Sequence, residues 1–360
     1  MKTHNNPWLG KGLPDTSALA NGDVSKYLGS TRDLFKDRLK IVESPLLNLP
    51  ELANSLGVGA VLVKDERNRA GLGSFKALGA AYAIAKRAVK RVEDGTSASV
   101  ANALNGFTFA CASAGNHGLS LATGAPAFGA EAVVFVAETV PEAFAERLKK
   151  QGARVVRAGA NYEASMEEAQ RQADENDWIL LPDSTWPGMV EAGRDVMEGY
   201  LIMGEEIAQQ ISEPPTHVFL QAGVGGLAAA CAVSARETWG DEVKIVIVEP
   251  EDAPALQASI DAGKAVVAPG PVSIMGRLDC KEPSHLALKY LASEANAFVT
   301  ISDSEAAQTV SWLAARGFET TPSGAAGLSA LHHASDHFAK LGLSASSRVL
   351  CYLSEGPEDV

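Results

Sequence analysis

The stretch VLVKDERNRAGLGSFKALGAAYA, residues 61–83, decides the fold. Its first three residues are apolar and predict a short strand, and the small apolar residues after Lys76 predict a helix. A lysine that opens such a helix is expected to be partly desolvated, which lowers the pKa of its amine. A deprotonated amine is what a Schiff base requires. The alternative is an ordinary solvated lysine at a helix start.

Strand and helix patterns alternate through most of the remaining chain. Because repeated strand–helix units form parallel sheets covered on both faces, we expect an α/β fold with two open twisted parallel-sheet domains. The large domain is predicted at 1–104 and 189–360, and the small domain at 105–188. The first forty residues are expected to form an arm that wraps on the surface or on a partner subunit. Strands are predicted at 107–111, 132–136, 154–157, 178–181, 217–221, 244–249, 298–301 and 348–353, with helices at 49–56, 117–123, 141–151, 162–173, 191–211 and 227–238 and from Asp303 and Ser323.

Composition excludes several classes of partner. The 360 residues carry a formal net charge of -13, which argues against nucleic acid, because binding phosphates needs a clustered basic surface. No apolar run reaches transmembrane length, and the first residues lack a signal peptide's apolar segment. The four cysteines are far apart, which predicts reduced thiols in the cytoplasm and neither a disulfide frame nor a metal site.

Three more loops with unusual residues follow predicted strands, where ligands of open parallel sheets gather. Residues 113–118 read SAGNHG and combine a helix start with polar side chains, although a plain capped turn has the same pattern. Residues 221–227 read QAGVGGL, and their glycines let backbone amides face a single phosphate. Ser354-Glu355-Gly356 ends the last strand and offers a hydroxyl, or forms only a terminal turn.

Taken together, these segments resemble the fold-type II pyridoxal phosphate enzymes, the group of threonine dehydratase and tryptophan synthase β. The resemblance runs from Ser44-Pro45-Leu46 to Ser354. The sequences of these segments are most similar to those of the diaminopropionate ammonia-lyases. The supporting segments are Asn6-Pro7-Trp8, residues 74–79 (SFKALG), 115–118 (GNHG), 183–186 (DSTW), Gly199-Tyr200 and 218–225 (VFLQAGVG).

The resemblance implies pyridoxal 5'-phosphate as cofactor, bound covalently by Lys76, which then acts as a base. Asp183 corresponds to a second acidic position of the family, and either Asp183 or the cofactor phosphate is expected to assist the leaving group as an acid. The cofactor-binding residues implied are Lys76, Phe75, Asn116, Gly223, Val224, Gly225, Gly226, Leu227 and Ser354. Asn116 would bind the phenolic oxygen, the glycine loop the phosphate, and Ser354 the pyridine nitrogen.

The substrate-binding residues implied are Ser113, Ala114, Gly115, His117 and Arg277. The first three would lie along the substrate carboxylate. His117 is of a type that titrates near neutrality, and its alternative role is that of a packed or hydrogen-bonding residue at a helix start. Arg277 would pair a second carboxylate and so favour an acidic substrate. Its alternative role is a structural ion pair with Asp279 or Glu282.

Two positions depart from the family pattern. The ammonia-lyases have an aspartate at the position of Ala114, linked to removal of the α-proton of the D-isomer. The dehydratases have a glutamate at the position of Thr321, which precedes Pro322. The chain therefore combines features of both subfamilies.

We predict β-elimination on a small L-α-amino acid, such as 2,3-diaminopropionate or a 3-hydroxy amino acid, giving a 2-oxo acid and ammonia. The alternatives are β-replacement or racemisation on the same cofactor, and a catalytically silent binding subunit. The intact lysine and glycine loop argue against the silent subunit. A homodimer is expected from the resemblance.

Overall fold

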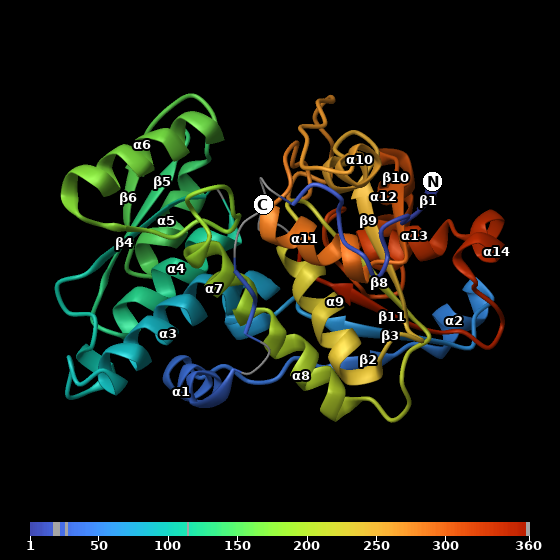
Figure 1. Cartoon of the computed structure of the whole chain (residues 1–360), viewed down its shortest axis with the longest axis horizontal. Helices are drawn as coiled ribbons and strands as arrows, with labels where there is room; N and C mark the ends of the chain where they lie inside the picture. The colour runs from blue at the N-terminus through green and yellow to red at the C-terminus, as the bar shows by residue number, and fades with distance from the viewer. Residues whose placement is uncertain (17–21, 26–27, 114, 358–360) are drawn as a thin grey trace.

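The computed structural model describes residues 1–16, 22–25, 28–113 and 115–357, and the strands in this part of the chain form two separate sheets (Figure 1). One sheet has seven strands and the other has four. Helices cover both faces of each sheet. This is the predicted α/β class with two open, mostly parallel sheets.

The seven-stranded sheet has the order β1-β10-β9-β8-β11-β3-β2. Its five inner strands are parallel, and the two edge strands pair antiparallel with their neighbours. The edge strand β1 corrects the prediction of a surface arm, because the first residues extend the sheet. The strands are β1 Lys2–Asn5, β2 Leu46–Asn48, β3 Ala60–Asp65, β8 His217–Gln221, β9 Lys244–Pro250, β10 Ala297–Ile301 and β11 Arg348–Leu353.

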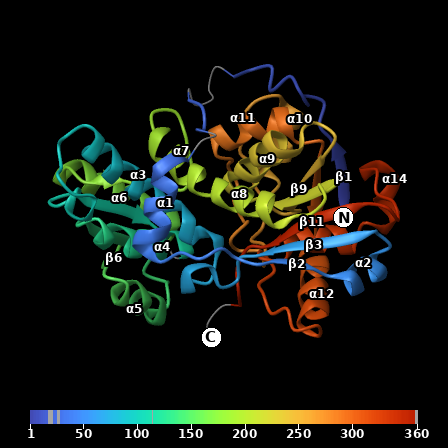
Figure 2. The ribbon, with the colours of Figure 1, turned by 90° about the horizontal axis from the view of Figure 1, so that it is seen from below.

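Alternate side chains of this sheet enter two cores on its opposite faces. On β8, Phe219 lies in one core, whereas Val218 and Leu220 lie in the other. Figure 2 shows α8, α9, α10 and α11 on one side of the sheet and α2 and α12 on the other. These helices are α2 Pro50–Leu56, α8 Leu201–Gln210, α9 Gly226–Trp239, α10 Ala255–Ala262, α11 His285–Glu294, α12 Asp303–Ala314, α13 Ala326–His332 and α14 Phe338–Leu341.

The four-stranded sheet is parallel throughout, with the order β6-β5-β4-β7. α6 packs on one face, and α4 and α5 pack on the other. α3 packs against α4 and α7, so the helix after Lys76 lies beside the smaller sheet (Figure 1). The exact domain boundaries stay a prediction. The elements are β4 Thr108–Ala112, β5 Glu131–Val136, β6 Arg154–Arg157, β7 Ile179–Leu180, α3 Gly79–Glu93, α4 Asn116–Ala127, α5 Glu142–Lys150 and α6 Tyr162–Asn176.

The helix predicted at 191–211 is wrong as a single element. It is divided at Tyr200 into α7, Glu191–Gly199, and α8. A methyl group on Gly199 would lie 2.2 Å from the carbonyl oxygen of Leu78. The backbone of α7 therefore packs directly on the segment that carries Lys76. α1, Gly29–Leu39, packs on α3 and was not predicted from the sequence.

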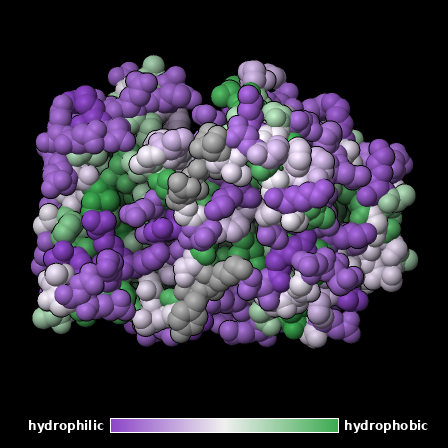
Figure 3. All heavy atoms as spheres, viewed as in Figure 1, coloured by the Kyte–Doolittle hydropathy of each residue, from purple (hydrophilic) through white to green (hydrophobic). Residues whose placement is uncertain are grey.

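The surface is largely hydrophilic on the face shown in Figure 3, with small scattered hydrophobic areas. Among the described residues, no helix is both long and apolar enough to cross a membrane.

Candidate active site

Lys76 lies in a short 3₁₀ helix, Phe75–Leu78, between β3 and α3. The hydroxyl of Ser74 caps this helix by accepting a hydrogen bond from the backbone N–H of Lys76 at 3.0 Å. The backbone N–H of Phe75 donates to the carbonyl of Ser354 at 3.1 Å. The lysine is thus held at the carboxyl ends of the neighbouring strands β3 and β11.

The amine of Lys76 donates a hydrogen bond to Oδ2 of Asp183, which follows β7 in the smaller sheet. Burial is the largest single influence and lowers the pKa of Lys76, but the charge of Asp183, its hydrogen bond to the amine and the neighbouring Tyr200 and Cys280 together raise this pKa above its ordinary value. Burial likewise raises the pKa of Asp183, and the charge of Lys76 brings it well below its usual range. The prediction that the amine of Lys76 loses its proton easily is therefore wrong for this side chain before it is linked to a cofactor. Since Asp183 is held ionised, its predicted role as an acid is also not supported.

His117 is buried in the first turn of α4. Its Nε2 lies 2.8 Å from the carbonyl oxygen of Leu181 and so carries the proton. Burial lowers the pKa of His117, and its Nδ1 has no hydrogen-bond partner among the described residues. The expectation that His117 titrates near neutrality is therefore wrong, because the ring stays neutral there.

The turn before α4 uses the hydroxyl of Ser113 to hold its own backbone. Oγ accepts hydrogen bonds from the N–H of Gly115 at 3.2 Å and from that of Gly118 at 3.1 Å. Arg277 lies against this turn, since a methyl group on Gly115 would be 3.6 Å from the guanidinium carbon. Ala114 lies outside the described residues.

Glu355 links Asn116 to Arg277. Its Oε2 accepts a 3.0 Å hydrogen bond from Asn116 Nδ2 and lies 3.8 Å from Arg277 Nε. Its Oε1 accepts a 2.5 Å hydrogen bond from the hydroxyl of Thr321. The ion pair predicted between Arg277 and Asp279 is wrong, because Asp279 pairs with Lys281. Glu355 belongs to the segment Ser354-Glu355-Gly356, in which only Ser354 was predicted to have a role.

The glycine loop connects β8 to α9, as predicted. Gly225 has a φ of +100° and precedes the first turn of α9, which has no side-chain cap. A methyl group on Gly223 would lie 2.9 Å from Cys280 Sγ and 3.1 Å from the carbonyl oxygen of Arg277. The loop therefore accepts only glycine at this position, and it leaves the uncapped amides of a helix N-terminus available to an anion.

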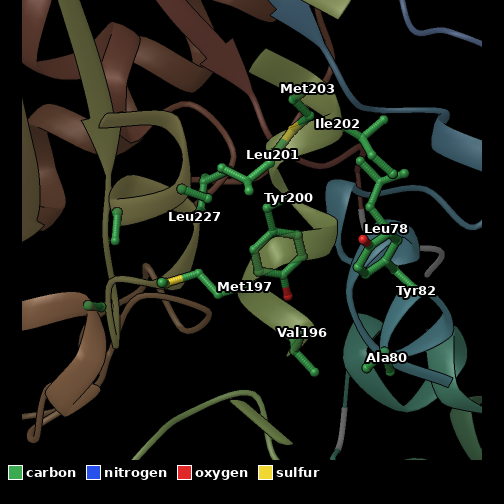
Figure 4. Packing of buried hydrophobic residues seen from close by; sticks show 14 of the residues in the cluster. Leu78, Ala80, Tyr82, Val196, Met197, Tyr200, Leu201, Ile202, Met203 and Leu227 are labelled. Atoms are coloured by element: carbon green, nitrogen blue, oxygen red, sulfur yellow. The ribbon is translucent and has the colours of Figure 1, made fainter. Parts of the chain in front are cut away.

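Tyr200 connects the lysine segment to the glycine loop. Its ring meets that of Phe75 edge to face, with 4.9 Å between the centroids. A methyl group on Gly226 would lie 3.7 Å from a carbon of the same ring. Figure 4 shows this ring near Leu227, the second residue of α9. One side chain thus spans the distance between the two parts of the site that the sequence predicts to meet.

The structure therefore brings most of the predicted residues to one region between the two sheets. Their individual roles in binding and catalysis stay predictions. Tyr200, Glu355 and Cys280 were not predicted to contribute. Their sequence signals were the place of Tyr200 in the Gly199-Tyr200 segment and the proximity of Glu355 to Ser354.

A separate surface groove of about 360 Å³ lies between α8 and α9. It contains none of the residues named above, and its position does not connect it to the lysine. No group of three or more metal-ligating side chains occurs within the described ranges.

Comparisons with known proteins agree with this arrangement. A family model described as "Pyridoxal-phosphate dependent enzyme" matches residues 38–355. The diaminopropionate ammonia-lyase of Salmonella typhimurium is 32% identical over 342 residues, which cover 87% of this chain and 85% of the relative. The biosynthetic threonine dehydratase 1 of Solanum lycopersicum is 30% identical over 256 residues, or 71% of this chain and 38% of that protein.

A solved structure shares the whole architecture. It is the Escherichia coli diaminopropionate ammonia-lyase in complex with D-serine, which is 28% identical and superimposes with a TM-score of 0.83. The match covers 99% of this chain and 93% of that chain.

Proposed function

Because this chain belongs to the family of pyridoxal-phosphate-dependent enzymes, with the fold-type II architecture, we propose that it eliminates the β-amino group of L-2,3-diaminopropionate. The products are a 2-oxo acid and ammonia. The cofactor is pyridoxal 5'-phosphate, and the enzyme is an ammonia-lyase or dehydratase that acts by β-elimination. The choice of diaminopropionate rests on the contact between Lys76 and Asp183.

The residues present fit this cofactor. The glycine loop is too closely packed for side chains at Gly223, and the first turn of α9 has no side-chain cap. A phosphate group satisfies such amides and is favoured by the helix dipole. Lys76 supplies the amine for the covalent link, and Asn116 retains a second N–H beyond the one that it donates to Glu355.

When bound, pyridoxal phosphate links covalently to an amine and withdraws electrons from the bonds at the substrate's Cα. Lys76 is the proposed base that accepts the α-proton at Nζ. Asp183 stabilises the charged form of this amine, as the raised pKa of Lys76 indicates. The ion pair therefore makes neutral Lys76 a stronger base.

Asp183 also bears on the identity of the leaving group. Its pKa is held low by the neighbouring cation, so at neutral pH it is a carboxylate and has no proton to donate. A β-ammonium group carries its own proton and leaves as ammonia, and its charge is complementary to that carboxylate. A β-hydroxyl needs a proton from elsewhere. This difference favours diaminopropionate over serine.

A 3-hydroxy amino acid is the second candidate. The residues 113–117 are similar to the dehydratase version of this turn, and Ala114 lacks the carboxylate of the ammonia-lyases. Because that carboxylate is linked to the D-isomer in the family, we propose that this chain prefers L-substrates. Arg277, next to Gly115, is proposed to bind a substrate carboxylate.

The ratio of products separates the two candidates. L-2,3-Diaminopropionate and water give one pyruvate and two ammonia, whereas L-serine gives one pyruvate and one ammonia. We expect turnover of the first substrate with a kcat/KM about tenfold or more above that of the second. Faster turnover of L-serine would show that the protein is a dehydratase and not a diaminopropionate ammonia-lyase. Amino-acid racemisation or β-substitution without release of a 2-oxo acid would exclude both.

We also propose a cytoplasmic homodimer. The four cysteines form no disulfide and three of them are buried, which is compatible with a reducing compartment. The dimer is suggested by the resemblance to the family. Sedimentation of the purified protein at several concentrations tests it, and a monomer throughout would contradict it.

A further inference from the structure

The hydroxyl of Tyr200 is a buried polar group without a protein partner. Tyr200 is 2% exposed, and its phenolic oxygen has no hydrogen-bond partner among the described residues. A buried hydroxyl without a partner costs about 1–3 kcal/mol, so such groups are normally satisfied by water or a ligand. The hydroxyl is therefore expected to find its partner in something that binds to the protein.

The space around this hydroxyl is provided by Gly79 at the start of α3. A methyl group on Gly79 would lie 2.7 Å from the phenolic oxygen. Lys76 is close enough to Tyr200 for each to affect the other's pKa. The ring of Phe75 contacts Tyr200 with 4.9 Å between the centroids, and the amine of Lys76 lies 5.8 Å from the centroid of the same Phe75 ring, so Tyr200 belongs to the surroundings of the amine that is proposed to hold the cofactor.

The opposite edge of the ring lies beside Gly226, at the first turn of α9. This turn has no side-chain cap, and α9 is 14 residues long, so its N-terminus is an anion site that lacks a protein anion. The ring of Tyr200 therefore lies between the lysine segment and the start of α9, and both the hydroxyl and this helix start have unsatisfied donors.

We propose that the Tyr200 hydroxyl donates a hydrogen bond to the phosphate group of bound pyridoxal phosphate and completes the site begun by the amides of α9. The phosphate is the anionic part of this ligand, and a phenol is a good donor to an anion. Burial raises the pKa of Tyr200 to about 12, so its proton is present at neutral pH. The inference rests on cofactor binding at this site and not on which substrate is used.

The test compares binding of pyridoxal phosphate and of pyridoxal, which lacks the phosphate, to the apo form of the full chain. In Tyr200→Phe the ring and its contact with Phe75 remain, and only the hydroxyl is lost. We expect the Kd of pyridoxal phosphate to rise about tenfold or more, as for a hydrogen bond to a charged group. The Kd of pyridoxal should change by less than about twofold.

The melting temperature of the apo form gives a second readout. Because the hydroxyl has no protein partner, Tyr200→Phe is expected to leave this temperature unchanged or to raise it. Tyr290→Phe is the matched control, since the Tyr290 hydroxyl already has a protein partner and accepts a 2.8 Å hydrogen bond from the N–H of Val24. That variant should bind both ligands as the wild type does.

Three results would overturn the proposal. The first is an unchanged Kd for pyridoxal phosphate in Tyr200→Phe. The second is an equal loss of affinity for pyridoxal phosphate and pyridoxal, which would show that the phosphate is not the partner. The third is a less stable or unfolded apo variant, which would show that the hydroxyl already has a partner in the protein. None of these measurements depends on lyase activity, so the proposed substrate can fail separately.

Discussion

The side-chain amide of Asn116 donates a 3.0 Å hydrogen bond to the carboxylate of Glu355 and joins the first turn of α4 to the segment after β11. Asn116 follows β4 of the smaller sheet, and Glu355 follows β11 of the larger sheet. Because a carboxylate only accepts hydrogen bonds, this contact fixes which end of the Asn116 amide faces Glu355. The other N–H of the amide is then free to face the bound cofactor.

We predict that Glu355 and Asn116 act as one unit. Glu355→Gln keeps the shape of the side chain but removes its charge, and it is expected to lower kcat/KM about tenfold, since hydrogen bonds to charged groups contribute about 1.5–3 kcal/mol. Asn116→Ala should have an effect of similar size. The double variant should be little worse than the more damaging single variant, because both changes remove the same hydrogen bond. Steady-state kinetics of the three variants measure this coupling.

Thr321→Val is the control for this cycle. The hydroxyl of Thr321 donates to Oε1 of Glu355, whereas Asn116 donates to Oε2. Thr321→Val removes this second hydrogen bond to Glu355. We expect it to lower kcat/KM by the same factor in the Asn116→Ala background as in the wild type. Fully additive effects of Glu355→Gln and Asn116→Ala would show that the hydrogen bond has no functional importance.

Lys76→Ala is predicted to abolish the covalent link to pyridoxal phosphate. The yellow colour of the purified protein and its activity should both be lost, with kcat reduced by at least about 10³-fold because the proposed base is also removed. Borohydride treatment of the wild type should add the mass of the reduced cofactor to the peptide that contains Lys76. Lys86→Ala, which removes a lysine paired with Asp195 and Glu198, is the control and should retain the label. A label on another lysine would contradict the assignment.

The pH dependence of cofactor uptake should be set by Asp183. The link forms on the neutral amine, and Asp183 holds the pKa of Lys76 above its ordinary value. Raising the pH therefore favours uptake in the wild type. Asp183→Asn removes the charge that raises the pKa of Lys76, while burial, which lowers this pKa, remains, so the pH profile should move to lower pH by at least about one unit.

The uptake rate can be followed by the near-visible absorbance of the linked cofactor between about pH 6 and pH 10. Asp195→Asn is the matched control, because Asp195 pairs with Lys86 away from the site. Its profile should coincide with that of the wild type. A profile of Asp183→Asn that also coincides would mean that Asp183 does not govern the amine.

The inner strands were predictable from the sequence because parallel strands buried on both faces read as continuous apolar runs. The predicted inner strands at 217–221 and 348–353 agree with β8 and β11 to the residue, and the predicted strand at 154–157 agrees with β6, an edge strand of the smaller sheet. β1 was missed because Lys2–Asn5 is polar and becomes a strand only by pairing with β10. The break at Tyr200 was missed because the helical pattern continues through it, and the structure shows it as two hydrogen bonds that span three residues, from the N–H of Tyr200 to Met197 and from that of Met203 to Tyr200.

The candidate site was predictable as a set of loops but not in its electrostatics. Parallel topology brings Lys76, the turn before α4 and the glycine loop to the same edges of the sheets. The raised pKa of Lys76 depends on Asp183, which is 107 positions away in the sequence. The partner of Arg277 was also out of reach, since Glu355 approaches it only in the folded chain. Sequence spacing carries no information about such contacts.

The turn before Lys76 is predicted to depend on a buried ion network around Arg69. The guanidinium of Arg69 donates to Glu66 at 2.7 Å and to Glu206 at 2.6 Å, and all three side chains are almost fully buried. Arg69→Met keeps most of the volume but removes the cation that Glu66 and Glu206 share, and the cations that remain in contact among the described residues, Lys64 and Lys36, both pair with Glu206. Breaking such a pair costs about 3–5 kcal/mol, because an uncompensated charge stays buried.

The free energy of unfolding of the apo-protein, measured by urea titration, is therefore expected to fall by about this amount. Arg171→Met is the matched control, since Arg171 pairs with Glu168 and Glu175 on the solvent side of α6, where water screens the charges. It should change the unfolding midpoint little. If the two variants unfold at the same urea concentration, the network does not stabilise the turn. If Arg69→Met alone is destabilised and also binds pyridoxal phosphate more weakly, the network helps to hold Lys76 in place.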